Sequence, residues 1–149
     1  MPSFQSRFTE TAGKPIFYQG KALYMMDNFP TEDSTRLRLY FETCNGEWRQ
    51  GVVLRVDGDF EVNGKVIGKD KQIVLWHDTA PQIVELGVPA NANMIEVYNV
   101  WDSGNVMTDA WHNGAAMIIE EVPNGRRYRC NDGLADDDFD DIVFRIERV

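Results

Sequence analysis

Apolar and polar residues alternate along most of this chain with the two-residue period of β-strands. In residues 36–42, for example, Leu37, Leu39 and Phe41 fall on one face. The same pattern marks further strand-like runs at residues 52–56, 60–67, 72–76, 82–86, 94–100, 116–122, 126–130 and 142–148. No segment of convincing length has a helical period. The pattern therefore predicts an all-β fold.

The spacing of these runs indicates how the strands are arranged. They recur about every ten residues and are separated by Gly, Pro, Asn and Asp, as in sandwiches and barrels. Asn63-Gly64 predicts a hairpin turn, because both central residues of a type I′ turn need a positive φ. The segment 31–34 is predicted to be a loop, and the polar residues 1–13 are predicted to be loosely ordered. We expect one domain over residues 1–149, an antiparallel β-sandwich of jelly-roll or Greek-key type with about eight to ten strands.

Composition narrows the class of protein. The chain has 149 residues, of which 43% are hydrophobic, enough to bury a core. A pI near 4.6 argues against nucleic acid as a partner, because phosphate binding needs a basic surface. No apolar stretch has the length of a membrane span, and residues 1–8 lack the apolar run of a signal peptide. We expect a cytoplasmic protein, or one exported without a classical leader or with its leader removed; a homo-oligomer remains open.

The negative charge is concentrated in residues 131–141. This acid run holds six aspartates and no Lys or Arg, whereas the rest of the chain has 18 acidic and 15 basic residues, so only −3 of the net charge of −9 lies outside it. Crowded carboxylates repel one another unless a cation or solvent relieves them. The following apolar residues 142–144 suggest ordered structure, so we predict a calcium site at a strand end. The alternative is a solvated acidic turn that protects an edge strand from aggregation.

The candidate calcium ligands are the oxygen-bearing side chains of the acid run: Asn131, Asp132, Asp136, Asp138, Asp140 and Asp141. If residues 138–140 enter a strand, Asp138 and Asp140 face one side and Phe139 faces the core. Asp141 then lies near the other side, where Asp132 and Asp136 fold back through a turn. The spacing differs from that of an EF-hand loop.

The acid run and the strand after it resemble the metal loop of the two-calcium fucose/mannose-binding bacterial lectins. That loop reads Glu-Asp-Gly-x-Asp-x-Asp-Tyr-Asn-Asp and precedes the last strand of a small β-sandwich. The residues that match its acidic and polar positions, in order, are Asn131, Asp132, Asp136, Asp138, Asp140 and Asp141. Phe139 stands in place of the Tyr, and the gap at residues 134–135 is one residue longer. The resemblance implies calcium as the cofactor and a carbohydrate or other small polar ligand as the partner, with calcium coordinating sugar hydroxyls directly.

Three segments place a tryptophan at a strand end or turn, followed by a polar or ionisable residue. They are Trp76-His77-Asp78, Trp101-Asp102 and Trp111-His112-Asn113. Tryptophan stacks on the C–H faces of sugars, and His, Asp and Asn form directional hydrogen bonds, so these segments are candidate ligand-binding residues. The alternatives are tryptophans that cap the core between turn-forming neighbours, and a transition-metal centre at His77, His112 and Asp102.

Two cysteines, Cys44 and Cys130, allow one disulfide, and the sequence leaves their pairing open. Arginines at 126, 127 and 129 could lower the thiol pKa of Cys130, or could balance the acid run. Our interpretation is a calcium-dependent, lectin-like carbohydrate-binding protein without covalent chemistry. One alternative is a small metal-dependent or cysteine enzyme that uses His77, His112 and Asp102, or Cys130. Another is a structural or interaction module with a structural calcium.

Overall fold

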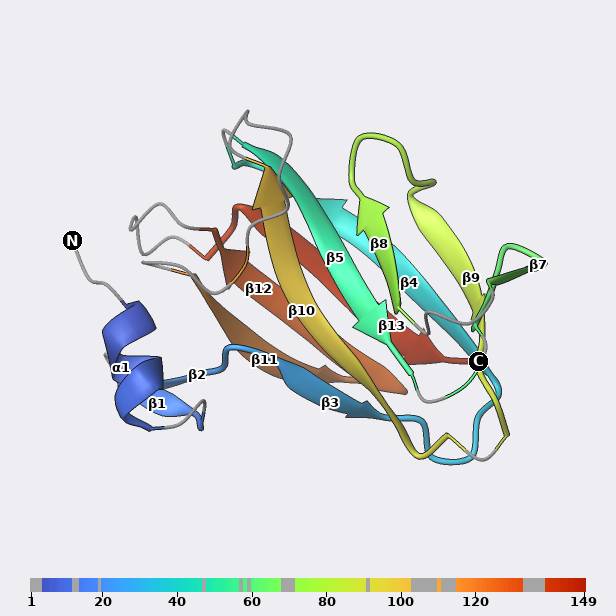
Figure 1. The fold of residues 1–149 in the computed structure, drawn as a ribbon, viewed down its shortest axis with the longest axis horizontal. Coiled ribbons are helices and arrows are strands. Elements are labelled where there is room, and N and C mark those ends of the chain that lie inside the picture. Colours follow the sequence, from blue (N-terminus) through green and yellow to red (C-terminus); the bar gives the residue numbers. More distant parts are fainter. Residues whose placement is uncertain are drawn as a thin grey trace.

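The computed structural model describes the chain except for residues 1–3, 12–13, 19, 47, 57, 59, 68–71, 91, 103–109, 111–114 and 133–138. The described residues form helix α1 (Phe4–Glu10) and thirteen strands in three antiparallel sheets (Figure 1). A hairpin pairs β1 (Ile16–Tyr18) with β2 (Lys21–Leu23). One sheet has the order β3 (Asp27–Pro30), β10 (Met94–Asp102), β5 (Arg49–Arg55), β8 (Gln72–Trp76). The other has the order β11 (Ala116–Val122), β12 (Gly125–Asn131), β13 (Ile142–Arg148), β4 (Arg36–Thr43), β9 (Ile83–Gly87), β6 (Phe60–Val62), β7 (Lys65–Ile67).

The four-stranded and seven-stranded sheets pack against each other, which confirms the predicted all-β sandwich (Figure 1). Buried apolar side chains from both sheets form one main core. The four-stranded sheet contributes, among others, Phe29, Val52, Leu54, Ile95 and Val97. The seven-stranded sheet contributes, among others, Leu37, Leu39, Phe41, Val84, Tyr128, Phe144 and Ile146.

The alternating pattern locates the longer strands correctly. Leu37, Leu39 and Phe41 are buried on β4, as their spacing predicts. The predicted turn at Asn63-Gly64 joins β6 to β7, and these two residues have φ values of 49° and 87°. A glycine or asparagine is favoured there because both positions are left-handed. The sequence pattern therefore predicts ten of the thirteen described strands.

The N-terminal segment is more ordered than predicted, because residues 4–10 form α1. Phe4 and Phe8 lie four residues apart on one face of this helix and are both buried. With the β1–β2 hairpin they form a second apolar cluster, which contains Phe4, Phe8, Ile16, Leu23, Ala116 and Phe139. We call α1 and this hairpin the N-terminal unit; it lies beside β11 in Figure 1. No helix in the described residues combines the length and apolarity needed to cross a bilayer.

The arginines of β12 pair with acidic residues of neighbouring strands. Arg126 contacts Asp27 Oδ2 at 2.9 Å, and Arg127 contacts Glu42 Oε2 at 2.8 Å. The third, Arg129, contacts an acidic side chain of β11 at 3.0 Å. Among the described residues, their ion-pair partners therefore lie on β3, β4 and β11.

Candidate cation site

At one end of the sandwich, polar residues replace apolar ones on the inward faces of two strands. On β5, Gln50 has the same parity as the buried Val52, and on β10, Asn99 has the same parity as the buried Val97. Gln50 and Asn99 are only 1% and 2% exposed. Buried amides of this kind need hydrogen-bond partners, which the acid run supplies here.

The two ends of the acid run meet at this polar end of the core. The backbone nitrogen of Asp132 donates a hydrogen bond to Asp141 Oδ2 at 2.9 Å. The backbone nitrogen of Asp141 donates to the Cys130 carbonyl at 3.1 Å, and that of Phe139 donates to Asn131 Oδ1 at 2.7 Å. These three bonds close a neck, defined here as residues 130–132 and 139–141. Asn131, Asp132 and Asp141 are buried in it.

Side chains from the four-stranded sheet hold the neck in place. Gln50 Nε2 donates to Asp132 Oδ2 at 2.7 Å and to the Trp48 carbonyl at 3.1 Å. Asn99 Nδ2 donates to the Asn131 carbonyl at 2.8 Å. Two buried atoms, Gln50 Oε1 and Asn131 Nδ2, have no hydrogen-bond partner among the described residues. The Gln50 amide therefore contacts Asp132 through its nitrogen, while its buried oxygen accepts no hydrogen bond from the described residues.

The loop between β4 and β5 covers the outer end of the neck. The backbone nitrogens of Asn45 and Gly46 each donate to the Asp141 carbonyl at 3.1 Å. Asn45 Nδ2 donates to Asp140 Oδ2 at 3.3 Å. A Cβ atom on Gly46 would lie 2.4 Å from Gln50 Nε2, so only glycine allows the loop to approach this closely. The loop, the neck and the inward amides thus form one connected polar cluster.

The condition that residues 138–140 enter a strand is not met at Phe139. Phe139 has a φ of 54°, which is left-handed and not extended, and β13 begins only at Ile142. The Phe139 side chain is buried, but in the N-terminal cluster and not in the main core. The alternating assignment of Asp138, Phe139 and Asp140 to opposite faces therefore has no basis. Asp138 itself, with Asp136, lies outside the described residues.

Four of the six predicted metal ligands lie in or beside the neck: Asn131, Asp132, Asp140 and Asp141. Within the described residues, no three His, Cys, Asp or Glu side chains are grouped so that they could hold a metal ion. Among the oxygen donors of the described part are the buried carboxylates of Asp132 and Asp141 and the amide oxygen of Gln50, whose nitrogen contacts Asp132. Their chemistry suits a hard cation such as calcium.

The rings of Trp76 and Trp101, which the sequence suggests as stacking faces for a ligand, each pack against another side chain of the protein. Arg49 lies over the ring of Trp76 at 4.4 Å from its centroid and donates to both oxygens of Asp78 at 2.9 Å. Trp101 is 2% exposed and stacks on Trp48.

The remaining members of the predicted ligand-binding set lie near β4 and β5 or outside the described residues. His77 is exposed, with its ring edge-on to Phe41 at 5.6 Å. Asp102 stands opposite Arg49 in the β10–β5 register. Trp111, His112 and Asn113 lie outside the described residues, so the set of His77, His112 and Asp102 is not assembled in them.

The cysteines are unbridged, and neither is activated. Cys130 is fully buried, and this burial, with a smaller effect of the Asp141 charge, raises its pKa well above the ordinary value. Burial likewise raises the pKa of Cys44, and the Asp141 charge adds to the effect. A nucleophilic cysteine needs a lowered pKa. Arg126, Arg127 and Arg129 form ion pairs with acidic residues of other strands. The surroundings of Cys130 therefore favour its neutral thiol.

The sequence analysis missed the residues that anchor the neck: Gln50, Asn99, Asn45 and Gly46. A signal existed for two of them, because Gln50 and Asn99 interrupt the inward apolar positions of otherwise regular strands. Asn45 and Gly46 lie in an irregular loop, where residue type alone does not reveal that their backbone nitrogens contact Asp141.

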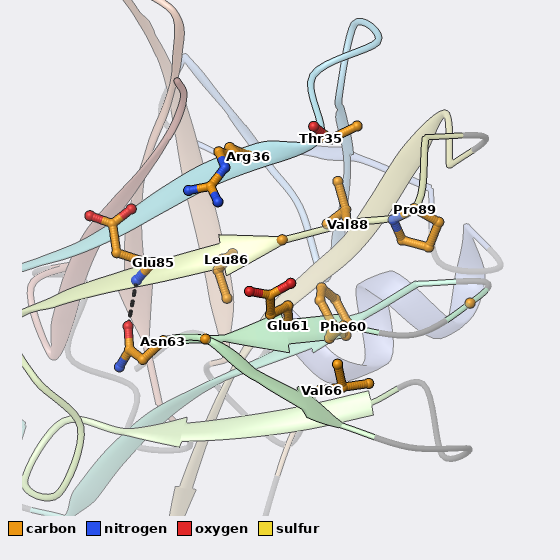
Figure 2. Close-up of a pocket in the computed structure, with 13 residues that line it drawn as sticks. Thr35, Arg36, Phe60, Glu61, Asn63, Val66, Glu85, Leu86, Val88 and Pro89 are labelled. Carbon is orange, nitrogen blue, oxygen red and sulfur yellow. Dashed lines mark hydrogen bonds between the residues drawn. The ribbon is translucent and has the colours of Figure 1, made fainter.

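A separate hollow of about 950 Å³ lies at the opposite end of β4 (Figure 2). Arg36, Gly87, Glu61 and Val66 stand in one register row across β4, β9, β6 and β7. Gly87 leaves space there, because a Cβ atom would lie 2.9 Å from Glu61 Cβ. This hollow is open and shares none of its lining residues with the neck.

No protein-family model, curated protein or solved structure matches this chain. The geometry of the neck and the chemistry of its side chains are therefore the basis for assigning a function.

Proposed function

We propose that this protein binds calcium at the neck of the acid run. The observation that carries the proposal is a pair of buried aspartates, Asp132 and Asp141, joined by a backbone-to-carboxylate hydrogen bond and contacted by the buried amide of Gln50, whose Oε1 has no hydrogen-bond partner among the described residues. Calcium takes about six to eight oxygen ligands, from carboxylates, amide carbonyls and water. The neck supplies oxygens of both protein types, from segments that are distant in sequence.

Charge supports a cation at this position. Burying carboxylates is costly unless a positive charge or hydrogen bonds compensate. The arginines that precede the acid run, Arg126, Arg127 and Arg129, form ion pairs with other strands. The acid run contains six aspartates and no basic residue. A bound divalent cation would offset this local charge more effectively than monovalent counterions.

The finer proposal is that the bound calcium recruits a carbohydrate. Its support is the resemblance of the acid run to the metal loop of the two-calcium fucose/mannose-binding lectins, together with the sandwich fold. In this mechanism, calcium coordinates sugar hydroxyls at positions that protein oxygens leave open, and aspartates accept hydrogen bonds from the same hydroxyls. If protein oxygens fill every position, the calcium is structural.

Calcium should raise the melting temperature of the metal-free protein, and chelation should reverse the change. A ligand that binds only the native state stabilises it by about 2.7 kcal/mol at a hundredfold excess over Kd. Differential scanning calorimetry in calcium, in excess chelator and in sodium chloride of matched ionic strength separates specific binding from charge screening. Asp132→Asn and Asp141→Asn should each weaken calcium binding in titration calorimetry. Asp78→Asn is the control, because Asp78 pairs with Arg49 outside the neck.

Equal melting temperatures in calcium and chelator would refute the calcium proposal. The carbohydrate step is tested on immobilised monosaccharides, which should retain the wild type only when calcium is present. Calcium binding without retention, and with a blank glycan array, would leave a structural calcium in a protein that binds no sugar.

A further inference from the structure

Phe139 links the neck to the N-terminal unit. Its backbone nitrogen donates to Asn131 Oδ1 at 2.7 Å, and the next two residues are Asp140 and Asp141. Its ring is 6% exposed and lies 6.2 Å, centroid to centroid, from the ring of Phe4 on α1. One residue is therefore part of both the polar cluster and the N-terminal apolar cluster.

The backbone of Phe139 is held in an unfavourable conformation. Its φ of 54° is in the left-handed region, which bulky side chains rarely occupy. Such a conformation costs about 1–3 kcal/mol and persists only when surrounding contacts enforce it. The described contacts are the Asn131 hydrogen bond and the packing of the ring in the N-terminal cluster.

This conformation directs the chain into the site. Two residues after Phe139, the Asp141 carbonyl accepts hydrogen bonds from the backbone nitrogens of Asn45 and Gly46. Asp141 Oδ2 accepts a hydrogen bond from the Asp132 backbone nitrogen. Without the anchor, Phe139 would relax toward a right-handed or extended conformation, which would redirect the two residues that follow. The carboxylate of Asp141 would then leave its position beside Asp132.

The N-terminal unit has its own limited attachment to the sandwich. Tyr24 and Met117 exchange two backbone hydrogen bonds, at 2.9 and 2.8 Å, just after the β1–β2 hairpin. Ala116 on β11 contributes to the N-terminal cluster, while its neighbour Met117 faces the main core. The unit can therefore loosen without opening the main core.

We propose that the N-terminal unit positions the cation site, with Phe139 as the positioning residue and Phe4 as its anchor. The inference rests on the proposed function, because it concerns the affinity of the same neck for calcium. Docking of Phe4 on Phe139 preorganises Asp140 and Asp141 and so tightens binding. By linkage, bound calcium stabilises the docked N-terminal unit by the same free energy.

Calcium titration calorimetry on the full chain tests this coupling. Phe4→Ala should raise the calcium Kd by about tenfold to a hundredfold, as loss of supporting contacts around metal ligands does. Phe4→Leu, which retains apolar packing, should recover most of the affinity. Phe60→Ala is the matched control, because Phe60 is a buried aromatic of the main core on β6. It should lower the melting temperature while leaving the Kd unchanged.

Limited proteolysis supplies a second measurement. Lys21 is exposed at the start of β2, and trypsin should cleave after it more slowly in calcium than in chelator. The protection should disappear in Phe4→Ala. These rates report docking of the N-terminal unit even if Phe4→Ala is too unstable for calorimetry.

The outcomes separate the two proposals. A wild type that binds no calcium overturns the proposed function and this inference with it. A wild type that binds calcium, with an unchanged Kd in Phe4→Ala or no protection at Lys21, overturns only the positioning role. An equal rise of Kd in Phe60→Ala also overturns it, because affinity would then follow overall stability.

Discussion

Gly46 and Gln50 illustrate how single atoms shape the neck. The Gln50 amide nitrogen is shared between Asp132 Oδ2 and the Trp48 carbonyl, and Gly46 leaves room for it. The torsions of Gly46 do not require glycine, since no positive φ is found there. The space beside Gln50 is the reason for the glycine. Because Gln50 is buried, its side chain cannot move away easily.

Gly46→Ala should therefore weaken calcium binding and lower stability. The added methyl group would displace the Gln50 amide from Asp132, and overpacking of this kind costs about 1–3 kcal/mol. Gly64→Ala is the control, because Gly64 lies in the β6–β7 turn, has a φ of 87° and has nothing within 4 Å of the added Cβ. It should lose stability through backbone strain alone and keep its calcium Kd. Urea unfolding and calorimetry measure the two effects; an unchanged Kd in Gly46→Ala would contradict the role of Gln50.

At this scale, the sequence identifies Asp132 and Asp141 through local charge density, and the structure brings them together. It does not identify Asn99 or Gln50, since a single amide in a strand is also common on solvent-facing surfaces. It misplaces Phe139, because alternation assumes extended backbone and cannot anticipate a left-handed residue. That conformation depends on tertiary contacts from a distant part of the chain.

Among the elements, β12 and its neighbours carry a cross-strand network of charges on the seven-stranded sheet. Glu42 of β4 contacts Arg127 Nε at 2.8 Å and Arg145 Nη1 at 3.4 Å, and the Arg145 guanidinium lies 4.0 Å from the Tyr40 ring centroid. The Glu42 side chain is only 23% exposed. A partly buried acid between two arginines contributes more than an isolated exposed pair.

Glu42→Gln should destabilise the protein by roughly 1 kcal/mol at low salt, and by less at high salt, because it removes the charge shared by two arginines. The matched control is Glu121→Gln, since Glu121 also pairs with an arginine at 2.8 Å but is 72% exposed. It should change stability little. Urea unfolding at two sodium chloride concentrations distinguishes them, and equal effects of the two substitutions would argue against a network centred on Glu42.

Element prediction succeeds where a strand is long and has one buried face, as for β4 and β13. It fails for β1, β2 and β3, which have three or four residues each and are too short to establish a period. Helix α1 was missed for a similar reason. Its seven residues bury only two phenylalanines, and they do so against partners far away in the sequence.

For the molecule as a whole, Tyr128 links the two sheets through a buried phenol. Its hydroxyl donates to Asp27 Oδ2 at 2.6 Å, and Asp27 also pairs with Arg126. Burial raises the pKa of Tyr128 far above its ordinary value, and the charge of Asp27 and the hydrogen bond to it raise the pKa further, whereas Arg126 lowers it. The unfolded chain thus releases this proton at lower pH than the native protein.

Stability should therefore fall as pH rises above 10.0, the ordinary pKa of tyrosine, and the Tyr128 contribution is fully present below that pH. Each further pH unit should cost about 1.4 kcal/mol from this group. Tyr128→Phe should be less stable than the wild type by about 1.5–3 kcal/mol near neutral pH, because it loses a hydrogen bond to a carboxylate. The difference should shrink above pH 10.0, while the other tyrosines cancel in the comparison. A difference independent of pH in chemical unfolding would contradict this.

The place of β13 has a consequence for synthesis on the ribosome. This strand pairs with β12 on one side and with β4 on the other, so Arg148 lies opposite Leu37 in the middle of the sheet. Until residues 142–148 have emerged from the ribosome, β4 and β12 each present an unpaired edge, and the neck lacks Asp141 as well. Closure of this sheet therefore waits for β13. In the nascent chain, the aspartates of residues 131–141 emerge just before this strand, and we expect their charge to oppose association of the two open edges until it arrives.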